Sequence, residues 1–318
     1  SEFFSPPDGK KFEEDIQGNF GGIGAELGLR DDQLVVISPL KDSPAFRAEL
    51  KAKDAILAVD SRPTQGLPID EAVSNIRGEV GTKVVLTIFR EGWEKPKDIT
   101  IVREVITIPT LEYEMKGGSI AYVNLYSFNA NSESLFRRSM TKALTSGSKG
   151  MILDLRDNPG GFLQVAVDLA GWFLPRGTLV VSEKDKTGEM TKLYSAGNSA
   201  LKKFPVVVLI NNGSASASEI LAGALQDQRK IKLVGETTYG KGTVQQLLPL
   251  KDNSSIKVTI ANWVLPSGHI IEGEGIQPDF EVKRTEKDFE NEKDPQLDKA
   301  IEVLKDEITE NKNTVFHL

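Results

Sequence analysis

The chain has 318 residues, a net charge of −7, two histidines and no cysteine. Without cysteine there can be no thiol nucleophile, disulfide or cysteine-ligated zinc, and two histidines cannot build a histidine-rich site. We therefore expect no metal and no cofactor. An acidic chain without a basic stripe makes nucleic acid an unexpected partner, and no apolar run is long enough for the chain itself to span a membrane. The length predicts two domains.

The first third of the chain reads as a small α+β domain. Residues 8–18 predict a short polar helix, within an N-terminal helical segment over 1–18. The sequence starts at Ser1 without a signal peptide, so we expect that an export segment has been removed. Residues 19–104 then form a strand-rich pattern with two helices. Strands are expected at 34–38, 55–59, 83–89 and 98–102, and helices at 45–50 and 68–76.

Strands and helices alternate over residues 105–290. Strands are expected at 120–125, 150–155 and 206–210, and helices at 132–146, 162–173 and 216–228. Continuous apolar strands separated by helices favour a largely parallel sheet covered on both faces, in a mixed α/β core. Residues 291–318 predict a C-terminal helix and tail, with a surface helix over 295–308.

Ser216 lies where a buried strand passes through a turn of small residues into a helix. The start of a helix offers free N–H groups and a favourable dipole, which suits a nucleophile whose intermediate carries an oxyanion. The stretch Ser216-Ala-Ser-Glu219 also has the spacing of a capping box, which begins many ordinary helices. This segment alone leaves both interpretations open.

Lys241 lies between Gly240 and Gly242, so its backbone can enter a tight site. A lysine acts as a general base only when it is neutral, which requires burial, and the neighbouring apolar segments favour burial here. A turn at Gly242 would let Gln245 orient the amine, whereas a solvated loop lysine is the alternative. A nucleotide-binding phosphate loop is excluded, because Gly242 replaces the required hydroxyl residue and a strand follows.

A glycine pair, Gly160-Gly161, ends the segment that starts at Asp154 and follows a buried strand. One of its N–H groups could join the amide of Ala217 as an oxyanion donor, although a plain strand-to-helix turn explains the segment equally well. His269 lies in the turn Pro-Ser-Gly-His, and the chain has no Gly-x-Ser-x-Gly elbow. A Ser–His–Asp triad is therefore not predicted.

In combination and in this order, these motifs resemble the carboxyl-terminal processing peptidases, relatives of the tail-specific protease. The motifs are Gly-Ser-Ala-Ser-Ala-Ser-Glu-Ile, Tyr-Gly-Lys-Gly-Thr-Val-Gln-Gln and Pro-Ser-Gly…Gly-Glu-Gly-Ile-Gln-Pro-Asp, within a match from about Phe12 to Val282. The resemblance implies a peptidase core with a ClpP/crotonase-like sheet. It makes Ser216 the nucleophile, Lys241 the base and Gln245 its orienting partner, with Gly160 or Gly161 as oxyanion donor.

The first domain resembles the PDZ module of that family. The resemblance implies that the backbone of Gly21-Gly22-Ile23-Gly24 receives the terminal carboxylate of a peptide, which pairs with residues 25–29 as an added strand. Leu27 and Val73 are the candidates for its apolar pocket, together with Ile23. The chain departs from the family pattern at three positions, where Glu49 and Lys53 replace glycines and His269 replaces arginine.

The leading hypothesis is a serine endopeptidase that captures unstructured C-terminal tails and cleaves them by a Ser–Lys dyad assisted by glutamine. The alternative is a non-catalytic PDZ scaffold with an inactive peptidase domain. The resemblance implies an exported protein of the bacterial periplasm or cell envelope. The expected partners are protein or peptide substrates with exposed C-terminal tails. A homo-oligomer or an adaptor protein stays open.

Overall fold

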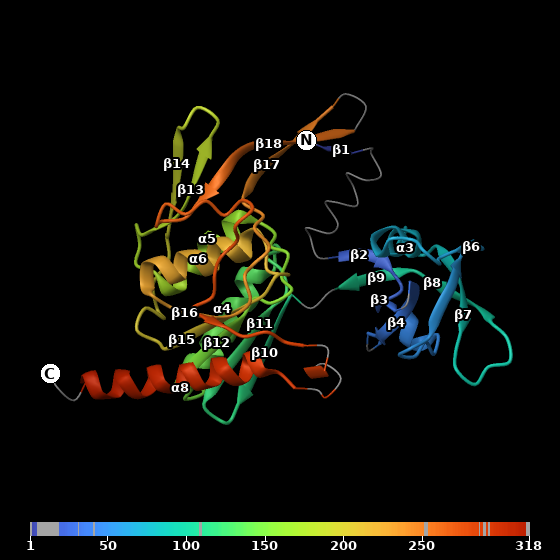
Figure 1. Ribbon diagram of the computed structural model, residues 1–318, viewed down its shortest axis with the longest axis horizontal. Helices are drawn as coiled ribbons and strands as arrows, with labels where there is room; N and C mark the ends of the chain where they lie inside the picture. The colour runs from blue at the N-terminus through green and yellow to red at the C-terminus, as the bar shows by residue number, and fades with distance from the viewer. Residues whose placement is uncertain are drawn as a thin grey trace. The chain divides into compact units, whose positions relative to one another are not determined.

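The chain forms two compact units (Figure 1). The computed structural model describes residues 2–4, 19–30, 32–40, 42–107, 110–250, 254–285, 287–288, 291 and 293–315. One unit consists of residues 11–108, and the other of residues 1–10 together with 109–318. The helix predicted over 8–18 lies outside the described residues, and residues 2–4 form a short strand, β1 (Glu2–Phe4).

Among its described residues, the unit of residues 11–108 is rich in strands and has two helices, as predicted. Its main sheet is antiparallel, in the order β3 (Ala25–Arg30), β4 (Gln33–Pro39), β5 (Ala55–Val59), β7 (Lys83–Phe89), β8 (Lys97–Val102), and β6 (Arg62–Pro63) pairs with β5. A separate pair joins β2 (Asn19–Gly22) to β9 (Glu104–Thr107). The helices are α2 (Pro44–Arg47), shorter than the predicted 45–50, and α3 (Ile69–Ile76).

The core of this unit follows from the alternation of its strands. In β7 every second side chain is apolar, and Val84, Leu86 and Ile88 are fully buried. Successive side chains of a strand point to opposite faces, so these three share one face. They belong to the same buried cluster as Ala72 and Ile76 of α3. The hydrophobic faces of strand and helix thus build the core together.

The other unit is built on a six-stranded sheet, ordered β10 (Leu111–Lys116), β11 (Ile120–Leu125), β12 (Gly150–Asp154), β15 (Val206–Ile210), β16 (Lys232–Gly235), β19 (Phe280–Glu281). β10 runs antiparallel to β11, and the other neighbouring pairs are parallel. The helices are α4 (Ser132–Thr145), α5 (Leu163–Phe173), α6 (Ala217–Arg229) and α8 (Pro295–Val315).

Helices cover both faces of this sheet, as the apolar strands predicted. In β15, Val206, Val208 and Ile210 belong to the large core that contains α4, α5 and α6. Val207 and Leu209 face the other way, into the cluster formed with α8. Figure 1 shows α8 running along this second face of the sheet. β15 is therefore buried on both faces along its whole length, up to its last residue, Ile210.

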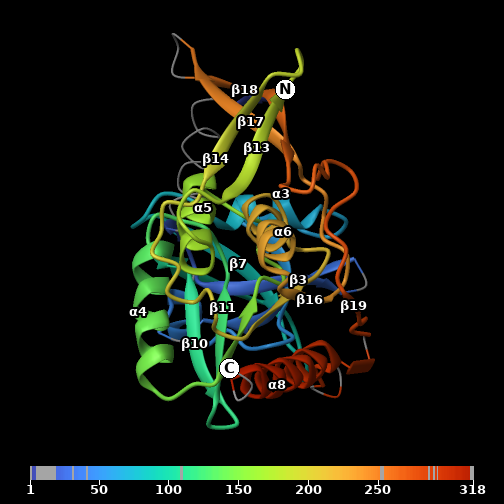
Figure 2. The same cartoon turned by 90° about the vertical axis from the view of Figure 1, so that its left-hand side faces the viewer.

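A second sheet was not predicted. It is antiparallel and contains β1, β13 (Leu179–Asp185), β14 (Met190–Tyr194), β17 (Thr243–Pro249) and β18 (Ser255–Val264). Figures 1 and 2 show its two hairpins projecting from the same end of the unit. Among the described residues, no helix combines the length and the apolar character that a membrane crossing requires.

Candidate active site

Ser216 occupies a strained turn at the start of α6. Its backbone has φ 56° and ψ −114°, a region that residues other than glycine rarely adopt. Such a conformation costs about 1–3 kcal/mol and persists only where the surroundings impose it. Here Asn158 imposes it, because its carbonyl oxygen accepts the N–H of Ala215 at 3.0 Å and the hydroxyl of Ser218 at 2.9 Å. The turn is thus held on both sides of Ser216.

Glu219 completes the turn from within the helix. Its side chain is fully buried, and Oε2 accepts the N–H of Ser216 at 2.7 Å. This is the glutamate half of the capping box that the sequence indicated. The capping interpretation and the nucleophile interpretation are therefore compatible, since a carboxylate that caps the helix also fixes the peptide at Ser216.

Lys241 lies in the loop between β16 and β17, residues 236–242, which we call the lysine loop, and its side chain is exposed. The expectation of a buried lysine is therefore wrong for this structure. No hydrogen bond joins the Lys241 amine to the Ser216 hydroxyl in the described part of the chain. The glycines that flank Lys241 are held by residues 272–273, about 30 positions later in the chain, and this packing fixes the backbone at Lys241. A Cβ on Gly242 would lie 2.2 Å from the amide nitrogen of Glu272, and the backbone of Gly240 accepts the N–H of Gly273.

Gln245 lies within strand β17 and is exposed. The turn expected at Gly242 does not reverse the chain, because the extended strand begins at Thr243. The Gln245 amide donates a long 3.5 Å bond to the hydroxyl of Thr243. It makes no hydrogen bond to Lys241 within the described residues, so orientation of the amine by Gln245 stays a prediction.

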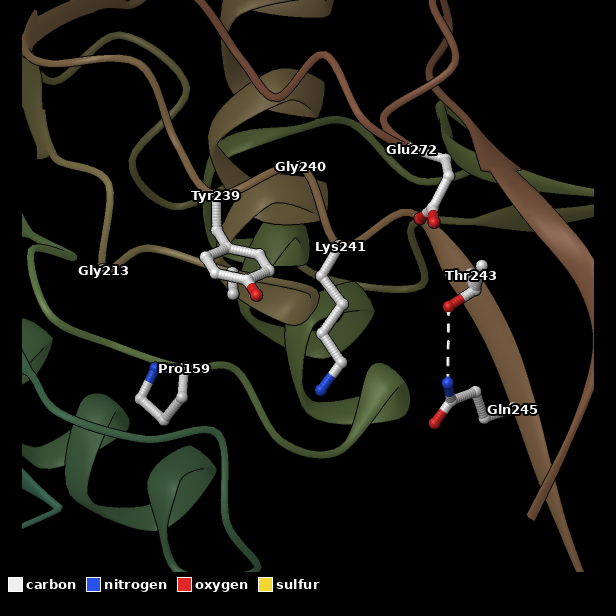
Figure 3. A pocket seen from close by; sticks show the side chains of 9 residues that line it. Pro159, Gly213, Tyr239, Gly240, Lys241, Thr243, Gln245 and Glu272 are labelled. Atoms are coloured by element: carbon white, nitrogen blue, oxygen red, sulfur yellow. Dashed lines mark hydrogen bonds between the residues drawn. The ribbon is translucent and has the colours of Figure 1, made fainter. Parts of the chain in front are cut away.

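An open pocket of about 410 Å³ lies beside the turn at Ser216 (Figure 3). Its walls come from the glycine turn, the residues before Ser216, the lysine loop and β17: Pro159, Gly213, Ala215, Tyr239, Gly240, Lys241, Thr243, Gln245 and Glu272. Figure 3 shows the Lys241 side chain pointing into this space, with Pro159 and Gln245 on opposite sides of it in this view. The structure thus brings Lys241 and Gln245 into one pocket with Ala215, the neighbour of Ser216.

The three candidate oxyanion donors differ in what their N–H groups contact. The N–H of Gly160 donates to Oδ1 of Asn158 at 2.9 Å. The N–H groups of Gly161 and Ala217 have no acceptor among the described residues. Gly161 has φ +141° and lies against Phe128, with which it forms a single bridge. An available N–H thus exists in both segments, and in the glycine pair it belongs to Gly161.

Glu272 is a site residue that the sequence analysis missed. It lines the pocket, and its carboxylate accepts the N–H of Gly242 at 2.8 Å. The signal was present, because Glu272 precedes the Gly-Glu-Gly of the quoted motif. His269, three residues earlier, is partly exposed, and its Nε2 contacts the carbonyl oxygen of Gly275 at 2.8 Å. It does not contact Ser216 among the described contacts, which agrees with its prediction as a turn residue.

A buried polar network connects α8 to the strand that precedes the glycine turn. Asp154, at the end of β12, binds Arg156 at 2.6 Å, and Arg156 binds Asp294 at 2.9 Å. Burial alone would lower the pKa of Arg156, but the hydrogen bonds and charge of Asp154 and then Asp294 raise it. Burial, followed by the charge of Asp154, also raises the pKa of the Tyr122 hydroxyl, which donates to Asp154. The network fixes the chain just before residues 157–161.

In the other unit, the candidate peptide-binding residues divide into two groups. Gly21 and Gly22 lie in β2 and pair with β9, so they are strand residues rather than loop residues. Ile23 and Gly24 form the short connection to β3, and Ile23 is part of the core. Leu27 on β3 and Val73 on α3 are only partly buried, and these two elements contact each other. Leu27 and Val73 thus stay candidates for an apolar pocket.

Two family models match this chain. Residues 21–101 match the model of the PDZ domain, and residues 119–282, about half of the chain, match the model of Peptidase family S41. The parallel strands of the α/β sheet and the strained turn at Ser216 lie within the peptidase match, and the strand-rich unit contains the PDZ match. The chain belongs to peptidase family S41.

Relatives and a solved structure agree with this membership. The chain is 41% identical over 283 residues to a Staphylococcus epidermidis protein named "Probable CtpA-like serine protease", and 40% identical over 285 residues to a Staphylococcus aureus protein of that name. Both alignments cover 89% of this chain, which spans 57% and 56% of the length of these relatives. The structure of a photosystem II D1 C-terminal processing protease is similar with a TM-score of 0.61 and 29% identity, over 89% of this chain and 77% of that one.

Proposed function

We propose that this protein is a serine endopeptidase in which Ser216 is the nucleophile and Lys241 the general base. The observation that carries the proposal is the strained Ser216 turn beside a pocket into which Lys241 points. The Ser216 oxygen attacks the peptide carbonyl carbon while the Lys241 amine takes the hydroxyl proton. The amine then passes this proton to the leaving nitrogen, and water hydrolyses the acyl-enzyme to restore Ser216.

The exposed amine of Lys241 becomes a base when substrate enters. A peptide lying over Ser216 fills the same pocket and removes water from the amine, and loss of water favours the neutral form of a lysine. Gln245, on the neighbouring strand, is the residue that we propose orients the amine once the pocket is filled. Occupation of the pocket thus supplies the desolvation that the free protein lacks.

The oxyanion is stabilised by two backbone N–H groups in this proposal. Ala217 supplies one from the first turn of α6, where the helix dipole also favours negative charge. Gly161 supplies the other, since its N–H has no acceptor among the described residues, whereas the N–H of Gly160 is bound to Asn158. In this proposal the role of Gly160 is to leave room for Ser216, because a Cβ on Gly160 would lie 2.9 Å from the Cβ of Ser216.

The PDZ domain would capture the C-terminal tail of a protein substrate. The carboxylate binds at Ile23 and Gly24, the peptide adds a strand beside β3, and its last side chain contacts Leu27 and Val73. We assign residues 19–104 to this domain, 105–290 to the peptidase core and 291–318 to the C-terminal helix and tail. We also propose that the protein acts outside the cytoplasm, in the bacterial periplasm or cell envelope, as the resemblance to the carboxyl-terminal processing peptidases implies.

A non-catalytic peptide-binding scaffold is the second candidate, and the exposed Lys241 favours it. A serine-reactive fluorophosphonate distinguishes the two, with mass spectrometry of the labelled peptide as the readout. The endopeptidase is labelled at Ser216, Ser216→Ala abolishes the label, and Ser134→Ala, at a partly buried serine of α4, leaves it unchanged. A protein that hydrolyses no tailed substrate and takes no label at Ser216 is the scaffold.

A further inference from the structure

We propose that Glu219 is a positioning residue that holds the turn at Ser216 and the lysine loop together. The inference rests on the proposed roles of Ser216 and Lys241. These two residues are 25 positions apart in the sequence and belong to different loops. Some group must set the distance between the two loops, because a base works only at hydrogen-bond range of its nucleophile.

The Glu219 carboxylate contacts both loops at once. Oε2 accepts the N–H of Ser216 at 2.7 Å and the N–H of Lys241 at 3.0 Å. Oε1 accepts the hydroxyl of Thr238 at 2.6 Å and the N–H of Gly240 at 2.7 Å. One oxygen therefore joins the backbone of the proposed nucleophile to the backbone of the proposed base.

The burial of Glu219 makes this arrangement costly to alter. Its side chain is 0% exposed, so no water can replace a lost partner easily. A carboxylate accepts up to about four hydrogen bonds and donates none, which matches the four donors found here. A glutamine of the same shape would bring an NH₂ group against two of those donors. The site thus requires a carboxylate and not merely a polar side chain of this size.

The bond from Ser216 also determines which helix N–H stays available. Because Glu219 takes the N–H of Ser216, the N–H of Ala217 has no acceptor among the described residues and is left for the oxyanion. The same bond fixes the peptide between Ala215 and Ser216, whose orientation accompanies the strained φ of Ser216. Glu219 thus supports the nucleophile and the oxyanion donor together.

A second carboxylate, Glu272, serves as a comparison. It accepts the N–H of Gly242, so three successive N–H groups of the lysine loop, from Gly240 to Gly242, donate to carboxylates. Glu272 is exposed, and its hydrogen bond reaches only the lysine loop. Of these two carboxylates, Glu219 is the one that connects the loop to Ser216.

The test is the substitution Glu219→Gln in the full chain, assayed on a disordered peptide with an apolar C-terminus. A displacement of about 1 Å between reacting groups costs roughly 100-fold in rate, so we expect kcat to fall by about 100-fold while KM stays within about twofold. Binding of the same tail to the PDZ domain should not change. Glu274→Gln is the matched control, since the Glu274 side chain is 76% exposed and its charged partner among the described residues is the partly exposed His269, 3.9 Å away.

The outcomes separate this inference from the proposed function. If a folded Glu219→Gln variant keeps the wild-type kcat while Ser216→Ala is inactive, the positioning role is wrong and the nucleophile assignment stands. If Ser216→Ala keeps full activity, both fail. A selective loss of kcat in a folded Glu219→Gln variant supports the role, because a merely structural residue would lower the folded fraction without changing the kcat of folded enzyme.

Thr238 provides a second test that holds even if Glu219→Gln does not fold. Thr238→Val removes the hydroxyl that donates to Glu219 and accepts the N–H of Ile276, whereas Thr238→Ser keeps it. If the lost hydrogen bond raises the activation free energy by about 1 kcal/mol, kcat of the valine variant falls roughly fivefold. The serine variant should recover to within about twofold of wild type. Equal kcat values for the two folded variants would overturn the proposal.

Discussion

Gly160 lies directly against Ser216. A Cβ on Gly160 would be 2.9 Å from the Cβ of Ser216 and 2.7 Å from the carbonyl oxygen of Ala215. Both distances are shorter than the contacts that a Cβ makes with nonbonded atoms, and the φ of Gly160 is +100°. We therefore predict that Gly160→Ala displaces the turn at Ser216 and lowers kcat/KM by about 100-fold, measured on a disordered peptide substrate with an apolar C-terminus.

The control for this variant is Gly177→Ala. Gly177 also has a positive φ, +81°, but no atom lies within 4 Å of its added Cβ. That variant should lose about 1 kcal/mol of stability from backbone strain and keep its kcat/KM. Equal activity of the two variants would show that contact with Ser216 is unimportant.

Two residues of the PDZ domain stand where the family pattern has glycines. Glu49 has φ 58° and Lys53 has φ 71°, so the turn keeps the left-handed geometry that glycine favours. A Cβ in the left-handed region costs each residue about 1–2 kcal/mol. A glycine would remove this cost, but its greater freedom in the unfolded chain would cancel part of the gain in stability. We predict that Glu49→Gly and Lys53→Gly each raise the free energy of unfolding of this domain by about 0.5–1 kcal/mol.

Chemical denaturation followed by the fluorescence of Trp93, which lies in this unit, checks the prediction. Ser74→Gly, inside α3, is the control, because the lower helix propensity of glycine should destabilise the domain by about 0.5 kcal/mol. Destabilisation by all three substitutions would contradict the prediction. It would mean that the side chains of Glu49 and Lys53 stabilise the domain by more than their left-handed backbone destabilises it.

The attachment of α8 should depend on pH through Asp294. Burial alone would raise the pKa of Asp294, but the hydrogen bond and charge of Arg156 outweigh it, so its pKa lies below the ordinary value. An aspartate in the unfolded chain has a pKa of about 3.9. The ionised carboxylate therefore stabilises the fold above that pH, and the contribution disappears as the pH falls through the lower folded-state pKa.

Asp294→Asn should accordingly cost about 1–3 kcal/mol at pH 7, since it leaves Arg156 with a weaker partner. The difference between the variant and wild type should shrink below about pH 4, measured by denaturation across pH. A constant difference from pH 7 to pH 3 would contradict an ionic role for Asp294.

The sheet and the turn at Ser216 could be predicted from the sequence for physical reasons. β15 is an unbroken apolar run, because each face of it packs on a layer of helices, and periodicity registers that directly. The small residues before Ser216 marked a tight turn into a helix. Both features depend on neighbours in the chain, which is why they could be predicted.

The second sheet and the state of the lysine could not be predicted in this way. β13 pairs with β18, about 80 positions later in the chain, and no pattern within either strand indicates that pairing. The exposure of Lys241 depends on packing between its loop and the residues around Glu272, which lie about 30 positions later. The capping-box spacing identified one bond of Glu219, but the three bonds to the lysine loop exist only in the folded chain.

The measurement that bears most directly on the Ser–Lys assignment compares single-turnover cleavage of a disordered, apolar-tailed peptide by wild type, Ser216→Ala, Lys241→Ala and Lys192→Ala. General-base catalysis contributes about 100- to 10,000-fold, so removal of the Lys241 amine should slow cleavage by at least about 100-fold. Ser216→Ala should be inactive, and Lys192→Ala, at an exposed lysine of β14, should match wild type. Cleavage by Lys241→Ala at close to the wild-type rate would contradict the assignment of Lys241 as the base.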